Sequence, residues 1–282
     1  MTETFTIERT RYTPTDKRLG RHVNHDSRSL RYLVEASDVN TLKSIRHERY
    51  IPILDQGSLG SCTGNAATGC LGTGEFWATV QDEEALSNSD AVVDEKYAVG
   101  VYSEATAIDP FAGTYPPTDT GSDGLSVAKV LQKRGLISGY QHATSFEAAL
   151  TALATQPVIV GTLWLTDMFH PATDGHLHLT GSRAGAHEYV LDELDMENER
   201  VWMANSWSTG WGVRGRAYFS FDDFKKLLSL QGDCTVFTPV TEPAPTPTPP
   251  APPAPPTPDP DAEFKQAAEA FKAALDKYLS RS

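Results

Sequence analysis

Hydrophobic and polar positions divide the middle of the chain into a helical part followed by a strand-rich part. Three helices are predicted, where apolar residues recur at helical spacing or follow a Gly-rich turn, over residues 62–78, 123–134 and 146–154. Four runs rich in β-branched and aromatic residues predict strands over 158–164, 188–194, 201–205 and 217–221. This order predicts an α+β fold, with a cleft where the two halves meet.

The segments on either side of this region follow other patterns. Residues 1–45 are charged and weakly periodic, which predicts an N-terminal arm packed on the surface, with one short helix near 39–45. Residues 46–240 hold most of the aromatic and β-branched residues and form the predicted folded domain. The tract 241–260 is Pro-rich. Because Pro fixes φ and lacks an N–H, this tract predicts a semi-rigid polyproline II linker.

Residues 261–282 carry a single apolar stripe at helical spacing. Its members are Phe264, Ala268, Phe271, Leu275 and Tyr278. The stripe predicts an amphipathic helix, although isolated helices of this length are marginally stable in water. Two interpretations stay open: a module that docks a partner or self-associates, and a solvated tail.

Charge and composition narrow the classes of partner. Lys and Arg number 24 against 37 Asp and Glu, and the net charge of −13 argues against nucleic acid. The sequence contains neither a signal-peptide core nor an apolar run of the ~20 residues that span a bilayer, so no membrane partner is expected. The default compartment is the cytoplasm, while export by another route or packaging into a virion stays open. Three Cys exclude a disulfide-rich scaffold.

The most informative stretch surrounds Cys62, in the sequence ILDQGSLGSCTGNAA of residues 53–67. It places a Cys after a Gly-rich turn and at the start of a predicted helix. The free N–H groups and the partial positive charge of a helix N-terminus favour thiolate over thiol, and the thiolate is the nucleophilic form. The alternative for Cys62 taken alone is a small buried hydrophobic side chain, which is the usual role of a free Cys.

Two later blocks supply partners for such a nucleophile. His187 precedes a predicted strand in the sequence GAHEYVL, and Asn205 follows another in MANSWSTGWG. An imidazole that takes the thiol proton and a carboxamide that orients the ring are the components of an activated Cys. Each residue taken alone has a simpler interpretation: His187 as an ordinary strand-end histidine and Asn205 as a turn residue.

These blocks resemble the motifs of papain-like cysteine peptidases, especially the bacterial and phage-encoded branch. The sequence QGSLGSC places Gln56 six positions before Cys62, and NSWSTGWG resembles the family's NSWGxxWG. His187 follows Cys62 by 125 residues and Asn205 follows it by 143, close to the ~130–150 typical of the family. The resemblance covers about residues 50–225.

The resemblance implies a papain-like two-subdomain fold and a hydrolase that cuts protein or peptide substrates without a cofactor. Cys62 resembles the nucleophile, His187 the general base and acid, and Asn205 the residue that orients the imidazole. Gln56 resembles the oxyanion-hole side chain, and Trp207 the aromatic that covers the Asn–His hydrogen bond. Cleft positions are expected at Gly60, Ser61 and Gly185.

The sequence departs from the family at several positions. Leu59 stands where plant and lysosomal relatives carry a second Cys, so their disulfide is missing. Thr63 replaces an aromatic residue, and Ser208 replaces a Gly. Glu188 follows the His where a small apolar residue is usual, and its carboxylate either points away from the site or shifts the His187 pKa. No GCxGG segment is present, although the block 120–125 resembles a cleft loop of the bacterial relatives.

Several alternatives remain open. A cell-wall peptide amidase uses the same Cys–His chemistry, and a non-catalytic structural or binding protein can be built on a peptidase fold. The arm 1–45 has a second interpretation as an inhibitory prosegment. Cys70 and Cys234 are expected to be buried free thiols, with a disulfide between them as the alternative. The loop containing His170, His176 and His178 is expected to be solvated rather than to bind a metal.

Overall fold

The computed structural model describes residues 7–11, 15–26, 29, 31–81, 94–240, 269 and 272. The chain divides into two compact units, Met1–Thr241 and Glu242–Ser282. The predicted Pro-rich linker, and all but two positions of the predicted C-terminal helix, lie outside the described residues. Within the described ranges, no helix combines the length and the apolar character that crossing a membrane requires.

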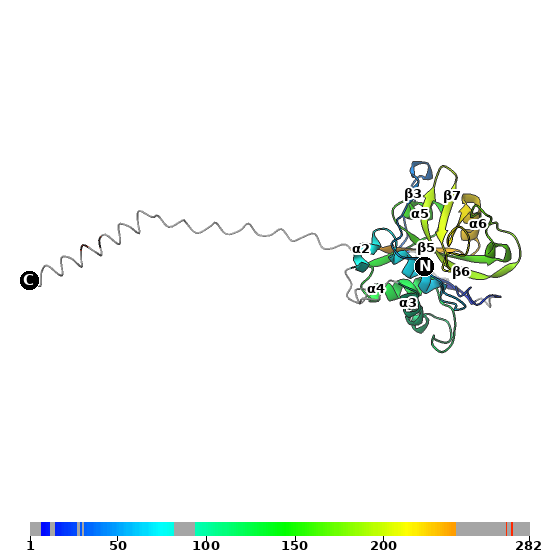
Figure 1. The fold of residues 1–282 in the computed structure, drawn as a ribbon, viewed down its shortest axis with the longest axis horizontal. Helices are drawn as coiled ribbons and strands as arrows, with labels where there is room; N and C mark the ends of the chain where they lie inside the picture. The colour runs from blue at the N-terminus through cyan, green and yellow to red at the C-terminus, as the bar shows by residue number, and fades with distance from the viewer. Residues whose placement is uncertain are drawn as a thin grey trace, which may run out of the picture. The chain divides into compact units, whose positions relative to one another are not determined.

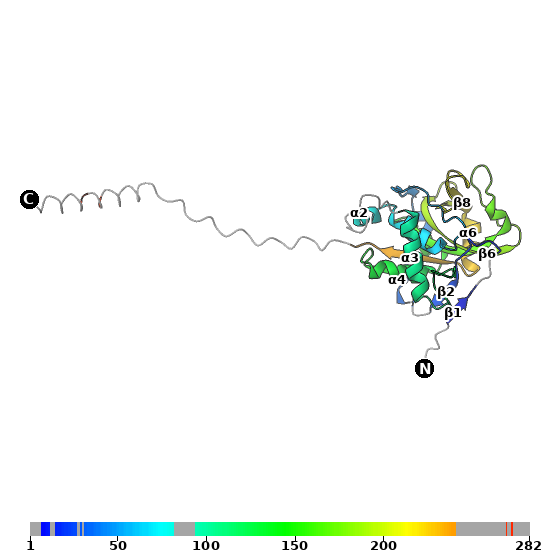
Figure 2. The same cartoon turned by 60° about the horizontal axis from the view of Figure 1, so that its bottom comes forward.

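Helices dominate the first half of the larger unit (Figures 1 and 2). They are α1 (Cys62–Leu71), α2 (Phe76–Gln81), α3 (Glu95–Ile108), α4 (Gly124–Lys133) and α5 (Phe146–Leu153). Helices α3, α4 and α5 begin where the side chain of Asp94, Asp123 or Ser145 accepts a hydrogen bond from a backbone N–H of the first turn. These N-caps satisfy donors that would otherwise lack an intrahelical partner.

An antiparallel sheet forms the second half. Its spatial order is β4 (Gly139–Ala143), β9 (Asp233–Thr238), β5 (Val158–Leu165), β6 (Arg183–Asp195), β7 (Arg200–Ala204) and β8 (Arg216–Ser220), and β3 (Ile45–Arg46) also pairs with β6. Strands β1 (Ile7–Thr10) and β2 (Val23–Asp26) pair separately, α6 (Phe221–Ser229) follows β8, and 3₁₀ turns occupy Val39–Thr41 and Thr166–Phe169.

The sheet separates two hydrophobic cores because side chains alternate along each strand. On β6, Tyr189 and Leu191 pack into the core shared with α5 and α6, whereas Val190 packs into the core shared with α1 and α4. In Figure 1, α3 and α4 lie on one side of the strands and α5 and α6 on the other. The predicted α+β class is confirmed, with α1 to α4 packed against one face of the sheet and α5 and α6 against the other.

Most predicted elements are present with shifted ends. The helix expected over 62–78 is wrong in one respect, because it is interrupted between Leu71 and Phe76. Gly74 adopts a φ of +62°, outside the helical region, and thereby separates α1 from α2. Helices α3 and α6 and strands β4 and β9 were not predicted, since their apolar positions are interrupted by polar residues.

The expectation of a surface arm is wrong for part of residues 1–45. Leu19, Arg21 and Val23 have no exposed surface, and His22 is 2% exposed. The helix expected near 39–45 is a single 3₁₀ turn, Val39–Thr41, followed by β3. Residues 19–24 therefore belong to the interior of the folded unit, and we call residues 15–26 the cleft segment for reasons given below.

The close contact between α1 and α3 generates a stability prediction. A Cβ on Gly64 would overlap the Ala98 carbonyl and lie 2.8 Å from Tyr102 Cβ. Gly64→Ala is therefore expected to lower the free energy of unfolding by about 1–3 kcal/mol, the usual cost of overpacking. The measurement is urea denaturation followed by circular dichroism.

Gly100→Ala in α3 is the matched control. Its added Cβ meets only the end of the Arg134 side chain, at 3.6 Å. It should be neutral or stabilise the protein by up to ~1 kcal/mol, because Ala is the better helix former. Equal effects of the two substitutions would contradict the packing argument.

Candidate active site

Cys62 is the first residue of α1 and is completely buried. The turn before it is fixed by Ser61, whose hydroxyl donates to Asn65 Oδ1 at 2.7 Å, while Asn65 Nδ2 donates to Glu95 at 2.7 Å. Burial raises the pKa of the Cys62 thiol to about 12. Hydrogen bonds from the backbone of Glu188 and Gly20 act in the opposite direction and lower this pKa, but burial is the larger effect. The thiol is therefore protonated at neutral pH in this conformation.

His187 and Asn205 meet in the sheet half. His187 lies on β6, Asn205 follows β7, and His187 Nε2 lies 2.7 Å from Asn205 Oδ1. The same oxygen accepts from the Ser206 N–H at 2.8 Å, which identifies it as the carboxamide oxygen and Nε2 as the protonated ring nitrogen. Nδ1 of His187 has no hydrogen-bond partner among the described residues. It is the nitrogen free to accept a proton.

Aromatic rings exclude water from this hydrogen bond. The ring centroid of Trp207 lies 4.7 Å from that of His187, and that of Trp164 lies at 4.9 Å. Phe169 stacks on Trp207 at 5.4 Å, and Trp211 donates from Nε1 to the Phe169 carbonyl at 3.0 Å. Burial in this cluster lowers the pKa of His187 to about 4, so the imidazole is neutral at pH 7.

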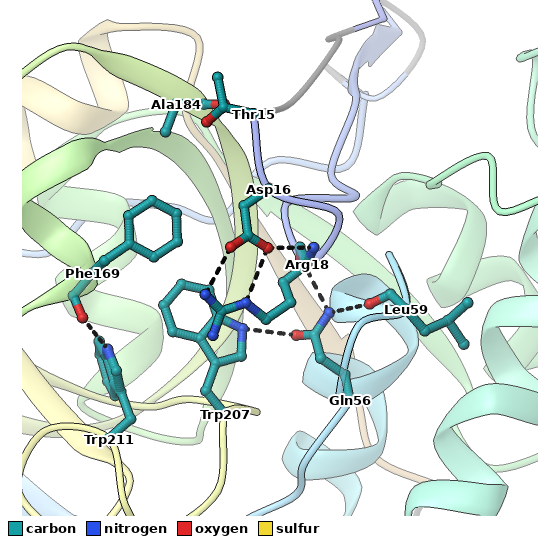
Figure 3. Close-up of polar contacts among 9 residues, drawn as sticks. All are labelled: Thr15, Asp16, Arg18, Gln56, Leu59, Phe169, Ala184, Trp207 and Trp211. Atoms are coloured by element: carbon teal, nitrogen blue, oxygen red, sulfur yellow. Dashed lines mark hydrogen bonds and ion pairs between the residues drawn. The ribbon is translucent and has the colours of Figure 1, made fainter.

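Gln56 connects this aromatic cluster to the turn before Cys62 (Figure 3). Its Oε1 accepts from Trp207 Nε1 at 3.2 Å and from the Ser206 hydroxyl at 2.7 Å. The amide nitrogen is thereby oriented in the opposite direction. It donates to the Leu59 carbonyl at 2.6 Å and to the Arg18 carbonyl at 3.1 Å. The side-chain amide thus has an N–H directed at a backbone carbonyl of the cleft segment.

The cleft segment, residues 15–26, runs between the two halves in contact with these residues. On the sheet side, Thr15 N–H donates to Ala184 O at 2.8 Å and Arg21 N–H donates to Ala186 O at 3.3 Å. On the helical side, Ser122 N–H donates to Gly20 O at 2.9 Å. The bridges from the segment to both sides are parallel. A backbone bound on both sides in this way occupies the groove as a peptide would.

Two further contacts hold the cleft segment against Trp207 and Gly60. The Arg18 guanidinium carbon lies 4.4 Å from the centroid of the Trp207 ring, and Asp16 holds the guanidinium by an ion pair at 2.8 Å (Figure 3). Gly20 lies against Gly60 so closely that a Cβ on Gly20 would overlap the Gly60 carbonyl. Only glycine allows this approach.

A Tyr–Asp pair fixes the helical side of the groove. Asp119 accepts from the Gly60 N–H at 2.9 Å and from the Tyr102 hydroxyl at 2.6 Å. The Tyr102 oxygen in turn accepts from the Gly121 N–H at 2.8 Å. Gly60 and Gly121, on the two loops that flank the segment, are therefore tied together through the hydrogen-bonded Asp119 and Tyr102 side chains. Neither Asp119 nor Tyr102 lies in a motif that sequence inspection singled out.

Among the predicted site residues, His187, Asn205, Trp207 and Gln56 are joined by direct contacts. Gly60 lies against Gly20 of the cleft segment, and Ser61 holds the turn before Cys62. Gly185 is buried on β6 opposite Trp164, two residues before His187. Sequence reasoning missed Arg18, Arg21 and Asp233, which lie far from the motifs along the chain and carry no local signal. Cys70 and Cys234 are buried free thiols. No group of three or more His, Cys, Asp or Glu suited to a metal occurs in the described part of the chain.

The covering of Cys62 by the cleft segment generates a labelling prediction. With the thiol pKa near 12, the thiolate fraction is small at neutral pH and rises about tenfold per pH unit. Iodoacetamide should therefore modify Cys62 slowly at pH 7 and faster at pH 9. Gly20→Ala, which forces the segment away from Gly60, should raise the rate at pH 7 at least about tenfold.

Lys17→Ala provides the control, because Lys17 is an exposed residue of the same segment. Its labelling rate should equal that of the unmodified chain, with peptide mass spectrometry assigning the label to Cys62 rather than Cys70. An unchanged rate in Gly20→Ala would show that the segment does not limit access to the thiol.

Comparisons with known proteins agree on the fold. No protein-family model and no curated protein sequence matches the chain. Xylellain, a cysteine protease from Xylella fastidiosa, matches with a TM-score of 0.59 and 17% identity over 84% of this chain and 100% of its own. Digestive procathepsin L 3 of the Tenebrio molitor larval midgut matches with a TM-score of 0.52 and 12% identity over 82% and 83%. The chain therefore has the fold of the papain-like cysteine proteases.

Proposed function

We propose that this protein is a cysteine peptidase that hydrolyses peptide bonds through a thioester on Cys62. The observation that carries the proposal is the buried 2.7 Å hydrogen bond from His187 to Asn205 under Trp207, on the groove that holds Cys62. This arrangement leaves Nδ1 of His187 as an acceptor for the thiol proton. The likeness of fold to xylellain supports the bacterial branch of the family.

The reaction follows from these groups in two halves. His187 Nδ1 takes the proton of Cys62, and the thiolate attacks the carbonyl carbon of the substrate. The imidazolium then protonates the leaving amine, and the C–N bond breaks to give the thioester. In the second half, His187 deprotonates a water that attacks the thioester, and the proton returns to the Cys62 sulfur as the acid leaves. Asn205 keeps the ring aligned throughout.

Gln56 and the Cys62 N–H are assigned to the oxyanion. The amide N–H of Gln56 that now donates to the Arg18 carbonyl would donate to the substrate oxygen. Because Oε1 is held by Ser206 and Trp207, the amide is oriented before substrate binds, which is what stabilisation of a developing charge requires. Gly60, Ser61 and Gly185 contribute the backbone that lines the groove.

In this conformation, the cleft segment must leave before a substrate enters. It holds the backbone groups of Ala186 and Ser122 and the amide of Gln56, which a peptide substrate would need. It also buries Cys62 and His187 so that both are neutral. We therefore assign the cleft segment the role of an inhibitory strap, the interpretation of the N-terminal arm that the sequence alone had not favoured.

A cell-wall peptide amidase is the second candidate, since it would use the same thiol and imidazole. The groove has backbone hydrogen-bonding partners on both sides. Such partners bind the main chain of an extended peptide, which favours a protein substrate over a cross-linked cell-wall peptide. A non-catalytic protein would not require the oriented Gln56 amide. Digestion of purified wall beside an unfolded protein separates the first two candidates.

Labelling with an epoxysuccinyl inhibitor tests the nucleophile. In the Gly20→Ala chain, Cys62 should be modified selectively, and the modification should be lost in Gly20→Ala/His187→Ala because the thiolate is no longer generated. Peptide mass spectrometry identifies the labelled residue. Cys70 and Cys234 serve as internal controls, being buried thiols outside the groove. Equal labelling of all three cysteines would exclude Cys62 as an activated nucleophile.

Substitution of Gln56 tests the oxyanion assignment. Gln56→Ala in the Gly20→Ala background should lower kcat for peptide hydrolysis by ~10²–10³-fold with little change in KM, because the donor acts on the charge that develops in the transition state. The measurement is steady-state kinetics on a fluorogenic peptide amide. A rise in KM at constant kcat would assign Gln56 to substrate binding instead.

A further inference from the structure

One carboxylate, that of Glu95, contacts both segments that carry the proposed oxyanion donors. Glu95 is the first residue of α3, and its Oε2 accepts from the Asp55 N–H at 3.0 Å. Both of its oxygens accept from Asn65 Nδ2, at 2.7 and 2.8 Å. Asp55 adjoins Gln56. Asn65 lies in the first turn of α1, which begins at Cys62. Glu95 therefore joins two segments that lie 40 and 30 residues away along the chain.

The contact with Asp55 holds the backbone beside Gln56. Asp55 forms an antiparallel bridge with Trp207, beside which the Gln56 N–H donates to the Ser206 carbonyl at 3.0 Å. In an extended backbone, successive N–H groups point to opposite edges, so the Asp55 N–H points away from this pairing. Glu95 supplies the acceptor on that second edge. The backbone from which the Gln56 side chain projects is thus held on both edges.

The contact with Asn65 fixes the peptide unit that contains the Cys62 N–H. Because Glu95 accepts from Nδ2, the carboxamide oxygen of Asn65 is turned towards Ser61, whose hydroxyl donates to it at 2.7 Å. The Ser61 carbonyl, which belongs to the same peptide unit as the Cys62 N–H, accepts from the Asn65 N–H at 2.9 Å. Ser61 has no exposed surface and Asn65 is 1% exposed, so water does not compete for these bonds. The direction of the Cys62 N–H therefore depends, through Asn65, on Glu95.

Glu95 is itself held against α1. Asp94 caps α3 by accepting from the Tyr97 N–H at 2.9 Å, which fixes the turn that contains Glu95. In the next residues, α3 packs so closely on α1 that a Cβ on Gly64 would overlap the Ala98 carbonyl. The carboxylate therefore has a fixed position relative to the helix that carries the candidate nucleophile.

We propose that Glu95 is the positioning residue of the oxyanion site. It sets the direction of the Cys62 N–H through Asn65, and that of the Gln56 side chain through the backbone of Asp55. It acts through these residues and not on the substrate. The proposal rests on the proposed peptidase function for the use of the two donors. The contacts of Glu95 stand without that function, so they have a test that needs no catalysis.

These contacts require the ionised form of Glu95. Asn65 Nδ2 and the Asp55 N–H are both donors, so a protonated carboxyl would direct an O–H at one of them. Burial raises the pKa of Glu95, the hydrogen bonds from Asn65 and Asp55 oppose this, and the carboxylates of Asp55 and Asp94 add to the rise. Of the helices packed on α3, α1 has only cysteines as titratable groups and α4 has two lysines. The positioning should be present above the raised pKa and be lost as the pH falls through it.

Steady-state kinetics on a fluorogenic peptide amide provides the first measurement, in the full chain carrying Gly20→Ala. Glu95→Gln keeps the shape of the side chain but turns an amide N–H towards a donor, so one contact is broken. It should lower kcat at least about tenfold with little change in KM, because both oxyanion donors act on the transition state. Glu104→Gln is the matched control, on the same helix but paired with Arg134 at 2.7 Å, and should leave both constants unchanged.

A double-substitution cycle separates positioning from a general loss of structure. If Glu95 acts through the oxyanion donors, its substitution matters less once Gln56 is replaced. The factor by which Glu95→Gln lowers kcat should be at least about threefold smaller in the Gln56→Ala chain. Glu95→Gln should also remove an acid limb from the pH profile of kcat that Glu104→Gln retains. If circular dichroism shows that Glu95→Gln does not fold, Asn65→Ala takes its place in the cycle.

Nuclear magnetic resonance provides a measurement without catalysis, on the amide groups of the full chain. The signals of the Cys62 N–H and of the Gln56 side-chain amide should shift with pH through one common midpoint, as Glu95 is protonated. This shift should be absent from Glu95→Gln and retained in Glu104→Gln.

The outcomes separate the two proposals. Hydrolysis in which Glu95→Gln equals Glu104→Gln, or in which the effects of Glu95→Gln and Gln56→Ala simply multiply, would overturn the positioning role and leave the peptidase standing. No hydrolysis of any peptide, with amide shifts that depend on Glu95, would support the positioning of the two amides and count against the peptidase. Amide shifts that persist in Glu95→Gln, in a chain without hydrolysis, would overturn the positioning role.

Discussion

The alternation of side chains along β6 is the constraint on which the site depends. Strand β6 pairs with β3, β5 and β7, so its register is fixed on both edges. His187 and Tyr189 therefore face one side of the sheet and Glu188 and Val190 the other. One strand thus supplies an imidazole to the aromatic cluster and a buried carboxylate that lies 4.0 Å from the Arg21 guanidinium of the cleft segment. A shift of register by one residue would exchange the two and destroy both.

The parts of the site that sequence inspection identified are those with a local signal. Cys62 follows a Gly-rich turn and His187 and Asn205 adjoin strands, whereas Gln56 was identified through the resemblance to the papain-like peptidases. The ion pair between Arg21 and Asp233 had no such signal. Arg21 and Asp233 are 212 residues apart along the chain, and only the pairing of β5 with β9 brings Asp233 to the groove. Because strand β9 was not predicted, the contact between Arg21 and Asp233 could not be predicted from the sequence.

The burial of the cleft segment could not be predicted from the sequence either. Its sequence is polar and charged, which normally indicates solvent exposure. Burial of Arg21 is possible because Asp233, Glu188 and the Gln231 carbonyl surround the guanidinium. Gly20 does not belong to any hydrophobic pattern in the sequence. Because it has no side chain, however, the backbone can approach Gly60 closely. Charge predicts exposure only when no complementary pocket exists, and that pocket is made by residues distant in sequence.

The cleft segment belongs to the same chain as the domain whose groove it occupies. This determines how the groove can be vacated. A separate inhibitor dissociates on dilution, whereas a tethered one is held at an effective local concentration set by chain length and independent of the amount of protein. Dilution therefore leaves the groove occupied. A peptide that displaces the segment must compete with an intramolecular ligand, and cutting the chain between the segment and β3 would convert that ligand into one that can diffuse away.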